Sequence, residues 1–127
     1  MYRFLSIHLF TPMGEMFRNI VYDHVIDRHL GEPITLADLA SHVHRNSGYI
    51  STLFKKEMKI NFSDYIKKQR IGVAKHMLIY TNREYAEIGN ILGFSSQSYF
   101  IKIFHQETGF TPKDYRKHFY MQDTLSH

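Results

Sequence analysis

The chain repeats a stretch of its own sequence at an interval of 50 residues. The segment LFKKEMKINFSDY at 53–65 aligns with IFHQETGFTPKDY at 103–115, and matching positions hold phenylalanine, glutamate and tyrosine. Upstream of this segment the interval is 49, because residues 39–43 align with residues 88–92. Two copies are too few for a solenoid, which needs about three to bury a continuous core. The repeat therefore predicts a duplicated unit whose two copies are joined by a connecting segment.

The repeated unit is helical, because apolar residues recur at helical spacing along most of the chain. Glycine and proline fall between the periodic runs, as they do at helix ends. Strict alternation of apolar and polar residues occurs only at residues 5–9, where it predicts a short strand or an extended arm. Helices are expected at about residues 13–30, 36–43, 47–58, 61–80, 85–92, 96–108 and 111–120.

Residues that typically cap helices stand at several of these boundaries. Thr35, with Asp38 three residues later, resembles a capping box. Gly109 suits a left-handed C-terminal cap. Thr111 before Pro112 suits an N-cap followed by a first-turn proline. The helix boundaries therefore follow from local chemistry as well as from periodicity.

The second helix of each copy has an apolar face and a polar face. The apolar residues, expected to form core, are Tyr49, Ile50, Leu53 and Phe54 in the first copy and Tyr99, Phe100, Ile103 and Phe104 in the second. The opposite face carries small polar residues and cations. Helix-turn-helix units bury one face of this helix and place the other in the major groove of DNA, where it meets base edges and phosphates. Both copies fit this division.

The stretch IGNILGFSSQSYFIKIFHQETGFTPKDYR at 88–116 resembles the signature of the AraC/XylS family of bacterial transcription regulators. ITLADLASHVHRNSGYISTLFKKE at 34–57 resembles the first helix-turn-helix of its DNA-binding domain, and Arg70, Ala74 and Leu78 fall at favoured linker-helix positions. The resemblance covers about 100 of the 127 residues. It implies an all-α fold of about seven helices, in which two helix-turn-helix subdomains are joined by a long linker helix. The two recognition helices would enter successive major grooves of B-DNA.

The resemblance also implies a domain organisation, with the DNA-binding domain at residues 16–120. Its parts are expected at about 35–58 for the first helix-turn-helix, 61–80 for the linker helix, 84–108 for the second helix-turn-helix and 111–120 for the last helix. Residues 1–15 are interpreted as an arm or the remnant of an upstream domain, and 121–127 as a tail. Family members usually carry a separate sensing or dimerisation domain. We therefore expect this chain to be monomeric and a full-length protein to dimerise through a domain that the chain lacks.

The resemblance places the DNA-binding residues on the polar faces of the two recognition helices. They are Ser47, Gly48, Ser51, Thr52, Lys55 and Lys56 in the first copy, and Ser96, Gln97, Ser98, Ile101, Lys102 and His105 in the second. The Gln97 amide suits a bidentate contact to adenine, and Lys102 can reach guanine acceptors or a phosphate. Ile101 suits a thymine methyl, with a scattered surface isoleucine or an extra core contact as the alternatives. Lys56 and Lys59 are expected to contact phosphate, as are the helix starts at Asn61 and Thr111.

Three positions receive a separate interpretation. Gly89 stands where the family usually has alanine, which adds backbone freedom to its helix. Glu84 occupies a cap position where serine or threonine would serve better, so Asn82 is considered as the cap instead. Arg70 lies on the apolar face of the linker helix and is interpreted as a buried structural pair or a cap interaction.

The basic residues are concentrated in the middle of the chain. Residues 45–75 hold eight basic and two acidic residues, a local charge of +6, whereas the whole chain carries +4. A solvated lysine-rich face is the alternative interpretation of this run. We expect the first unit to supply electrostatic attraction to DNA, since its recognition helix has small residues where bulkier ones often read bases. The second unit would supply more of the base discrimination.

Several functional classes find no support in the sequence. The chain has no cysteine, which excludes disulfides, thiolate metal sites and a cysteine nucleophile. Its nine histidines lack zinc-site spacing, and no pattern typical of an enzyme is present, so no metal, cofactor or catalysis is expected. The expected function is sequence-specific binding of double-stranded DNA in the cytoplasm, with RNA polymerase as a further candidate partner and no membrane contact. The alternative is a helical protein–protein interaction module that binds an acidic partner.

Overall fold

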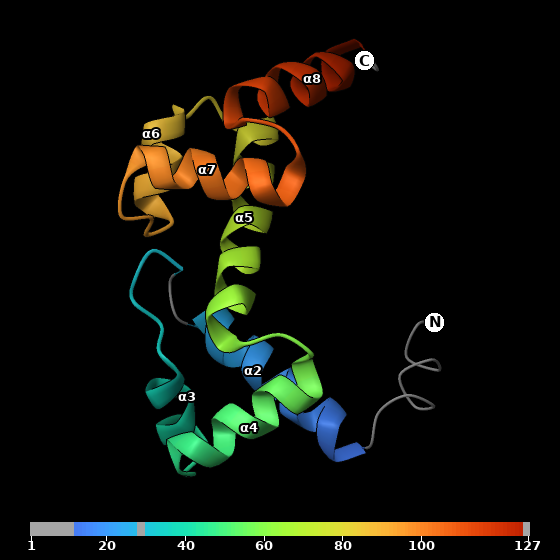
Figure 1. Cartoon of the computed structure of the whole chain (residues 1–127). Helices are drawn as coiled ribbons and strands as arrows, with labels where there is room; N and C mark the ends of the chain where they lie inside the picture. Colours follow the sequence, from blue (N-terminus) through green and yellow to red (C-terminus); the bar gives the residue numbers. More distant parts are fainter. Residues whose placement is uncertain (1–11, 28–29, 126–127) are drawn as a thin grey trace. The chain divides into compact units, whose positions relative to one another are not determined.

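The computed structural model describes residues 12–27 and 30–125. These residues form seven α-helices and no β-strand, which confirms the all-α class (Figure 1). The helices are α2 (Pro12–Asp27), α3 (Leu36–His42), α4 (Ser47–Met58), α5 (Phe62–Tyr80), α6 (Tyr85–Ile91), α7 (Gln97–Thr108) and α8 (Pro112–Leu125). The strand or arm expected at residues 5–9 lies outside the described residues.

The described chain forms two compact units. The first contains α2, α3, α4 and the start of α5 as far as Tyr65. The second contains Leu30–Pro33, the remainder of α5 from Ile66, and α6, α7 and α8. Each unit thus holds one copy of the sequence repeat.

A phenylalanine of the repeat lies at the centre of each core. In the first unit Phe54 is 1% exposed, and the ring of Tyr65 meets it edge-on at 5.5 Å and 80°. In the second unit Phe104 is fully buried, and Tyr115 meets it at 5.3 Å and 82°. Burial raises the pKa of both tyrosines, with Tyr22 as a second contribution at Tyr65. The sequence repeat is therefore a repeat of side-chain packing.

Side chains cap the helices largely where the sequence indicates. Thr35 and Asp38 form the expected capping box at the start of α3. Gly109 ends α7 in the left-handed conformation, with φ of 82°. Its counterpart at the end of α4 is Lys59, which also has a left-handed φ of 67°. A non-glycine residue carries a steric cost in this conformation. The end of α4 therefore carries a conformational cost that glycine avoids at the end of α7.

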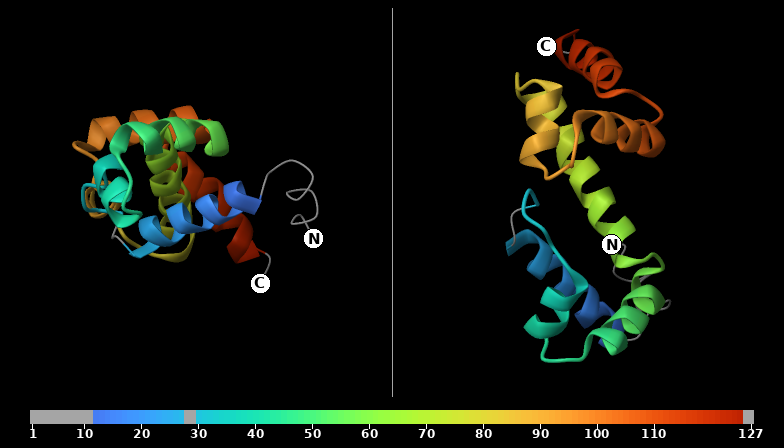
Figure 2. Two further views of the ribbon diagram at one scale, coloured as in Figure 1. Left: turned by 90° about the horizontal axis from the view of Figure 1, so that it is seen from below. Right: turned by 60° about the vertical axis from the view of Figure 1, so that its left-hand side comes forward.

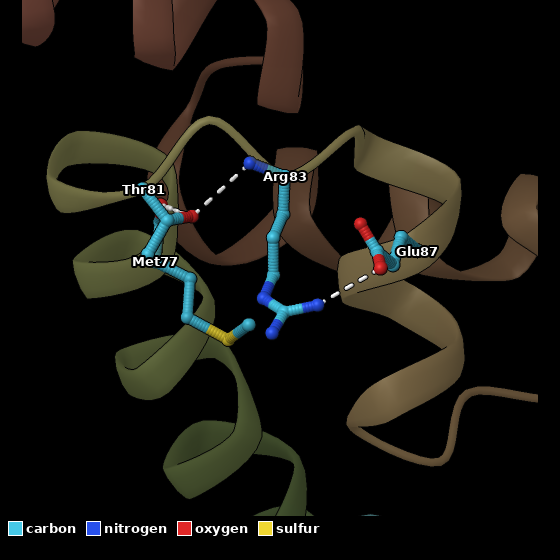
Figure 3. A network of polar contacts seen from close by, with 4 residues as sticks. All are labelled: Met77, Thr81, Arg83 and Glu87. Atoms are coloured by element: carbon cyan, nitrogen blue, oxygen red, sulfur yellow. Dashed lines mark hydrogen bonds and ion pairs between the residues drawn. The ribbon is translucent and has the colours of Figure 1, made fainter.

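The start of α6 differs from the expectation. The N-cap residue is Glu84, and no side chain makes a capping hydrogen bond there, so the expectation that Asn82 caps this helix is wrong. The preceding turn is stabilised by Thr81, whose hydroxyl donates to the Met77 carbonyl at 2.7 Å and accepts from the Arg83 amide at 3.3 Å (Figure 3). The Arg83 guanidinium then donates to Glu87 at 2.8 Å.

Gly89 has a packing role, because it is buried against the ring of Phe100. A Cβ at residue 89 would lie 3.0 to 3.2 Å from three atoms of the Phe100 side chain. The matching residues of the first copy are Ala40 and Ile50. The second copy therefore has a smaller residue on its short helix, Gly89 for Ala40, and a larger residue on the facing helix, Phe100 for Ile50. Close approach of the ring accounts for the glycine better than backbone freedom does.

Arg70 has the structural role that the sequence predicts. Its Nε donates to the Leu30 carbonyl at 2.8 Å, and its Nη2 donates to the Glu32 carbonyl at 3.2 Å. The guanidinium thus holds the loop Leu30–Pro33 to α5 within the second unit. Partial burial lowers the pKa of Arg70 below its ordinary value, although a guanidinium remains charged at neutral pH.

Candidate nucleic-acid interface

In each unit a tight turn joins a short helix to a longer one. The turn lies between α3 and α4 in the first unit and between α6 and α7 in the second (Figure 2). In the first, the Arg45 amide donates to the Ala40 carbonyl at 2.9 Å. In the second, the Phe94 amide donates to the Gly89 carbonyl at 3.0 Å. The residue before each donor has a left-handed backbone, and this residue is His44 in the first turn and Gly93 in the second. Both units are therefore helix-turn-helix units by hydrogen-bond pattern.

Side-chain caps hold the start of each second helix in the same way. The Asn46 side chain accepts from the Tyr49 amide at 2.9 Å, and the Ser96 hydroxyl accepts from the Tyr99 amide at 3.0 Å. Ser96, one of the candidate DNA-binding residues, thus already serves as the N-cap of α7. Because these caps fix the first turn, the residues just after them have a defined direction toward solvent.

The polar face of α4 is exposed over its whole length. All six candidate residues of the first copy are exposed, namely Ser47, Gly48, Ser51, Thr52, Lys55 and Lys56. Ile50 and Phe54 on the other face are each 1% exposed. The Thr52 hydroxyl donates to the Gly48 carbonyl of its own helix at 3.2 Å. This face therefore offers two lysines and little polar side-chain reach in its N-terminal half.

The polar face of α7 presents longer polar side chains. Ser96, Gln97, Ser98, Lys102 and His105 are all exposed. Ile101 is half-buried, yet it is not among the residues that pack against the core cluster of the described chain. Its side chain is therefore partly available at the edge of this face.

The apolar stripe of α4 departs from the prediction at one residue. Tyr49, expected in the core, is 55% exposed. Tyr99, at the same position of α7, is half-buried, packs against the core cluster of its unit and lies 6.1 Å from the Phe94 ring. The expectation for Tyr49 was wrong because the first turn has Arg45 in place of the buried Phe94.

An ion pair connects the second helix of each helix-turn-helix unit to the helix that opens the same unit. Arg18 of α2 lies 3.6 Å from Glu57 of α4, and Lys68 of α5 lies 2.9 Å from Glu107 of α7. Both partners recur at the interval of 50 residues, so the duplicated unit includes the opening helix as well. No local sequence pattern indicates this pairing, and only the alignment of residue 18 with residue 68 points to it.

The helix starts proposed as phosphate sites are less suitable than expected. The Asn61 side chain accepts from the Asp64 amide at 2.8 Å, and the Thr111 hydroxyl accepts from the Asp114 amide at 3.1 Å. In α8, Pro112 has no amide hydrogen to offer. Both aspartates are exposed in the first turn, where they favour a cation over a phosphate.

The described residues contain no group of three or more histidine, cysteine, aspartate or glutamate side chains that could hold a metal ion. The rings of His24 and His42 have centroids 4.8 Å apart. Among residues 12–27 and 30–125, no helix has the length and apolar character to cross a membrane.

Comparison with known proteins extends these observations. A family model described as "Helix-turn-helix domain" matches residues 39–118. The regulatory protein PocR of Salmonella typhimurium is 41% identical over 92 residues, which are 72% of this chain and 30% of PocR. The chain spans less than half the length of the curated relatives it matches.

Solved structures share the fold. The C-terminal domain of the two-component response regulator YesN from Fusobacterium nucleatum is 33% identical, with a TM-score of 0.69, covering 84% of this chain and 99% of that domain. The DNA-binding domain of AdpA, solved in complex with a target DNA, has a TM-score of 0.74 at 19% identity and covers 84% of this chain and 94% of its own. At that identity the AdpA likeness concerns the fold alone.

Proposed function

We propose that this chain, which belongs to the AraC/XylS family of helix-turn-helix proteins, is the DNA-binding part of a transcription regulator that recognises specific sequences in double-stranded DNA. The observation that carries the proposal is the pair of helix-turn-helix units, each with a buried apolar face and an exposed polar face on its second helix. The AdpA domain, which shares this fold, was solved on its target DNA, so the fold is compatible with such a contact.

In this proposal α4 and α7 are the recognition helices, and α5 is the linker between them. The two recognition helices, α4 and α7, would enter successive major grooves about one turn of DNA (~34 Å) apart. The proposed contacts are Ser47, Gly48, Ser51, Thr52, Lys55 and Lys56 of α4, and Ser96, Gln97, Ser98, Ile101, Lys102 and His105 of α7. Lys56 and Lys59 would mainly contact phosphates, whereas Gln97 and Lys102 have the reach to read base edges.

The proposal also covers the oligomeric state and the partners of the whole protein. The chain would bind an asymmetric site as a monomer, and a full-length protein would dimerise through a domain outside this chain. A regulator bound beside a promoter also comes within reach of RNA polymerase, which is therefore the second proposed partner. Such a protein would act in the cytoplasm by binding alone, without catalysis, and its relative PocR is a regulatory protein.

The first experiment selects bound sequences from random double-stranded DNA and measures affinity for the selected site by fluorescence anisotropy. Gln97→Ala should weaken binding to the selected site far more than binding to random DNA, because an amide lost from a base edge carries sequence information. Lys56→Ala should weaken both alike, because a phosphate contact carries none. About six phosphate contacts predict a log–log salt slope of roughly −5.

Failure to recover any sequence motif would count against the proposal. If the wild-type chain instead binds acidic polypeptides with the same affinity as DNA, the protein–protein interaction module becomes the better description.

A further inference from the structure

The exposed tyrosine of α4 has no role in the contacts proposed so far. Tyr49 is 55% exposed, while Tyr99 is half-buried at the corresponding position of α7. A tyrosine that packs in one copy and faces solvent in the other can have acquired a separate role in the exposed copy. The cause of the difference lies in the turn before each helix.

Two features of the first turn leave Tyr49 uncovered. Phe94, which lies 6.1 Å from Tyr99, is 8% exposed, whereas Arg45 at its position in the first turn is exposed. The second turn also has one residue more before its cap, since Ser95 stands between Phe94 and Ser96. The first unit therefore has no buried aromatic side chain in its turn at the place where Phe94 meets Tyr99.

The position of Tyr49 on α4 is one from which a side chain can reach DNA. Its amide donates to the Asn46 cap at 2.9 Å, so it lies in the first turn of the recognition helix. Residues at this end of a recognition helix contact base edges. The other exposed residues in the N-terminal half of α4, Ser47, Gly48, Ser51 and Thr52, are small. Among the exposed residues in the N-terminal half of α4, Tyr49 has the largest side chain.

We propose that Tyr49 reads DNA for the first unit, by packing its ring against the C5 methyl group of a thymine in the major groove. Apolar contact with this methyl group distinguishes thymine from the other bases. The inference rests on the proposed function. It also changes the expected division between the units, because the first unit then contributes base discrimination as well as electrostatic attraction.

The decisive test combines a protein change with a DNA change. Tyr49→Ala should lower affinity for the selected site by roughly fivefold to tenfold, and should leave affinity for random DNA nearly unchanged. Replacing each thymine of the first half-site in turn by uracil, which lacks the methyl group, should weaken wild-type binding at one position. Tyr49→Ala should be insensitive to uracil at that position. Tyr49→Phe should keep the wild-type response, because the ring makes the contact.

Tyr80→Ala is the matched control, because Tyr80 is also an exposed tyrosine, at 65%, and lies at the end of α5. It should bind the selected site like the wild type. Thermal unfolding should be nearly unchanged in both alanine variants, since an exposed ring contributes little to stability.

The inference is overturned if Tyr49→Ala binds the selected site like the wild type. It is equally overturned if no uracil substitution in that half-site affects wild-type binding, or if the variant responds to uracil as the wild type does. A wild-type chain without any sequence preference would contradict the proposed function itself.

Discussion

Arg70 offers a test of how the second unit is held together, through the variant Arg70→Met. Methionine keeps most of the side-chain length and removes the hydrogen bonds to the carbonyls of Leu30 and Glu32, at 2.8 and 3.2 Å. A hydrogen bond from a charged donor contributes about 1.5 to 3 kcal/mol, and less where water reaches it. The Leu30 bond is partly buried and the Glu32 bond is exposed. We therefore expect a loss of about 2 kcal/mol in the free energy of unfolding.

Arg83→Met is the control for this prediction. Arg83 donates to Glu87 at 2.8 Å, but the two side chains are 49% and 51% exposed (Figure 3). An exposed pair at this helical spacing contributes about 0.3 to 0.5 kcal/mol. The same substitution should thus cost several times less at residue 83 than at residue 70. Arg70→Lys should recover only part of the loss, because an ammonium lacks the planar fork that reaches two carbonyls.

Urea unfolding followed by circular dichroism measures the free energy, and amide hydrogen exchange in α5 and α6 assigns the loss to the second unit. Equal losses for Arg70→Met and Arg83→Met would refute the reasoning, as would a loss at Arg70 that spares the amides of α5.

Further predictions concern three other positions and their partners. Lys59→Gly should raise the free energy of unfolding by about 0.5 to 1 kcal/mol and lower the affinity for DNA. A variant in which stability and DNA affinity both rise, or both fall, would contradict this prediction. Arg18→Met should lower the free energy of unfolding by about 2 kcal/mol, because the Glu57 side chain, 11% exposed, loses its cationic partner. Lys68→Met should lower the free energy of unfolding by less than about 1 kcal/mol, since that lysine side chain is 52% exposed. Thermal unfolding of the two variants measures both losses, and an equal or larger loss for Lys68→Met would contradict the argument from burial.

The parts of the fold that depend on neighbouring residues could be predicted from the sequence. The capping box of Thr35 and Asp38 and the left-handed Gly109 need only a few residues to form, so their signals lie within one stretch of the chain. The duplicated core could be predicted as well, because the repeat keeps its phenylalanine and tyrosine at fixed positions. The assignment of the twelve candidate DNA contacts stays a prediction, although most of them are exposed.

Several features that depend on tertiary contacts have no signal in any local pattern of the sequence. The exposure of Tyr49 is set by which residue occupies the turn before its helix, and helical periodicity alone does not report this. The pair between Arg18 and Glu57 joins residues 39 positions apart, so no local pattern contains it. Gly89 was interpreted through its backbone, whereas its cause is the ring of Phe100.

The left-handed positions of the two copies bear on how the units divide their work. The second copy has Gly93 and Gly109 there, the residue that adopts a left-handed φ at little cost. The first copy has His44 and Lys59, with φ of 56° and 67°. Each non-glycine residue costs of order 1 kcal/mol in this conformation, and a cost of this kind persists where another gain compensates it. At Lys59 the compensating gain would be the positive charge, which is the gain expected of a unit proposed to attract DNA electrostatically.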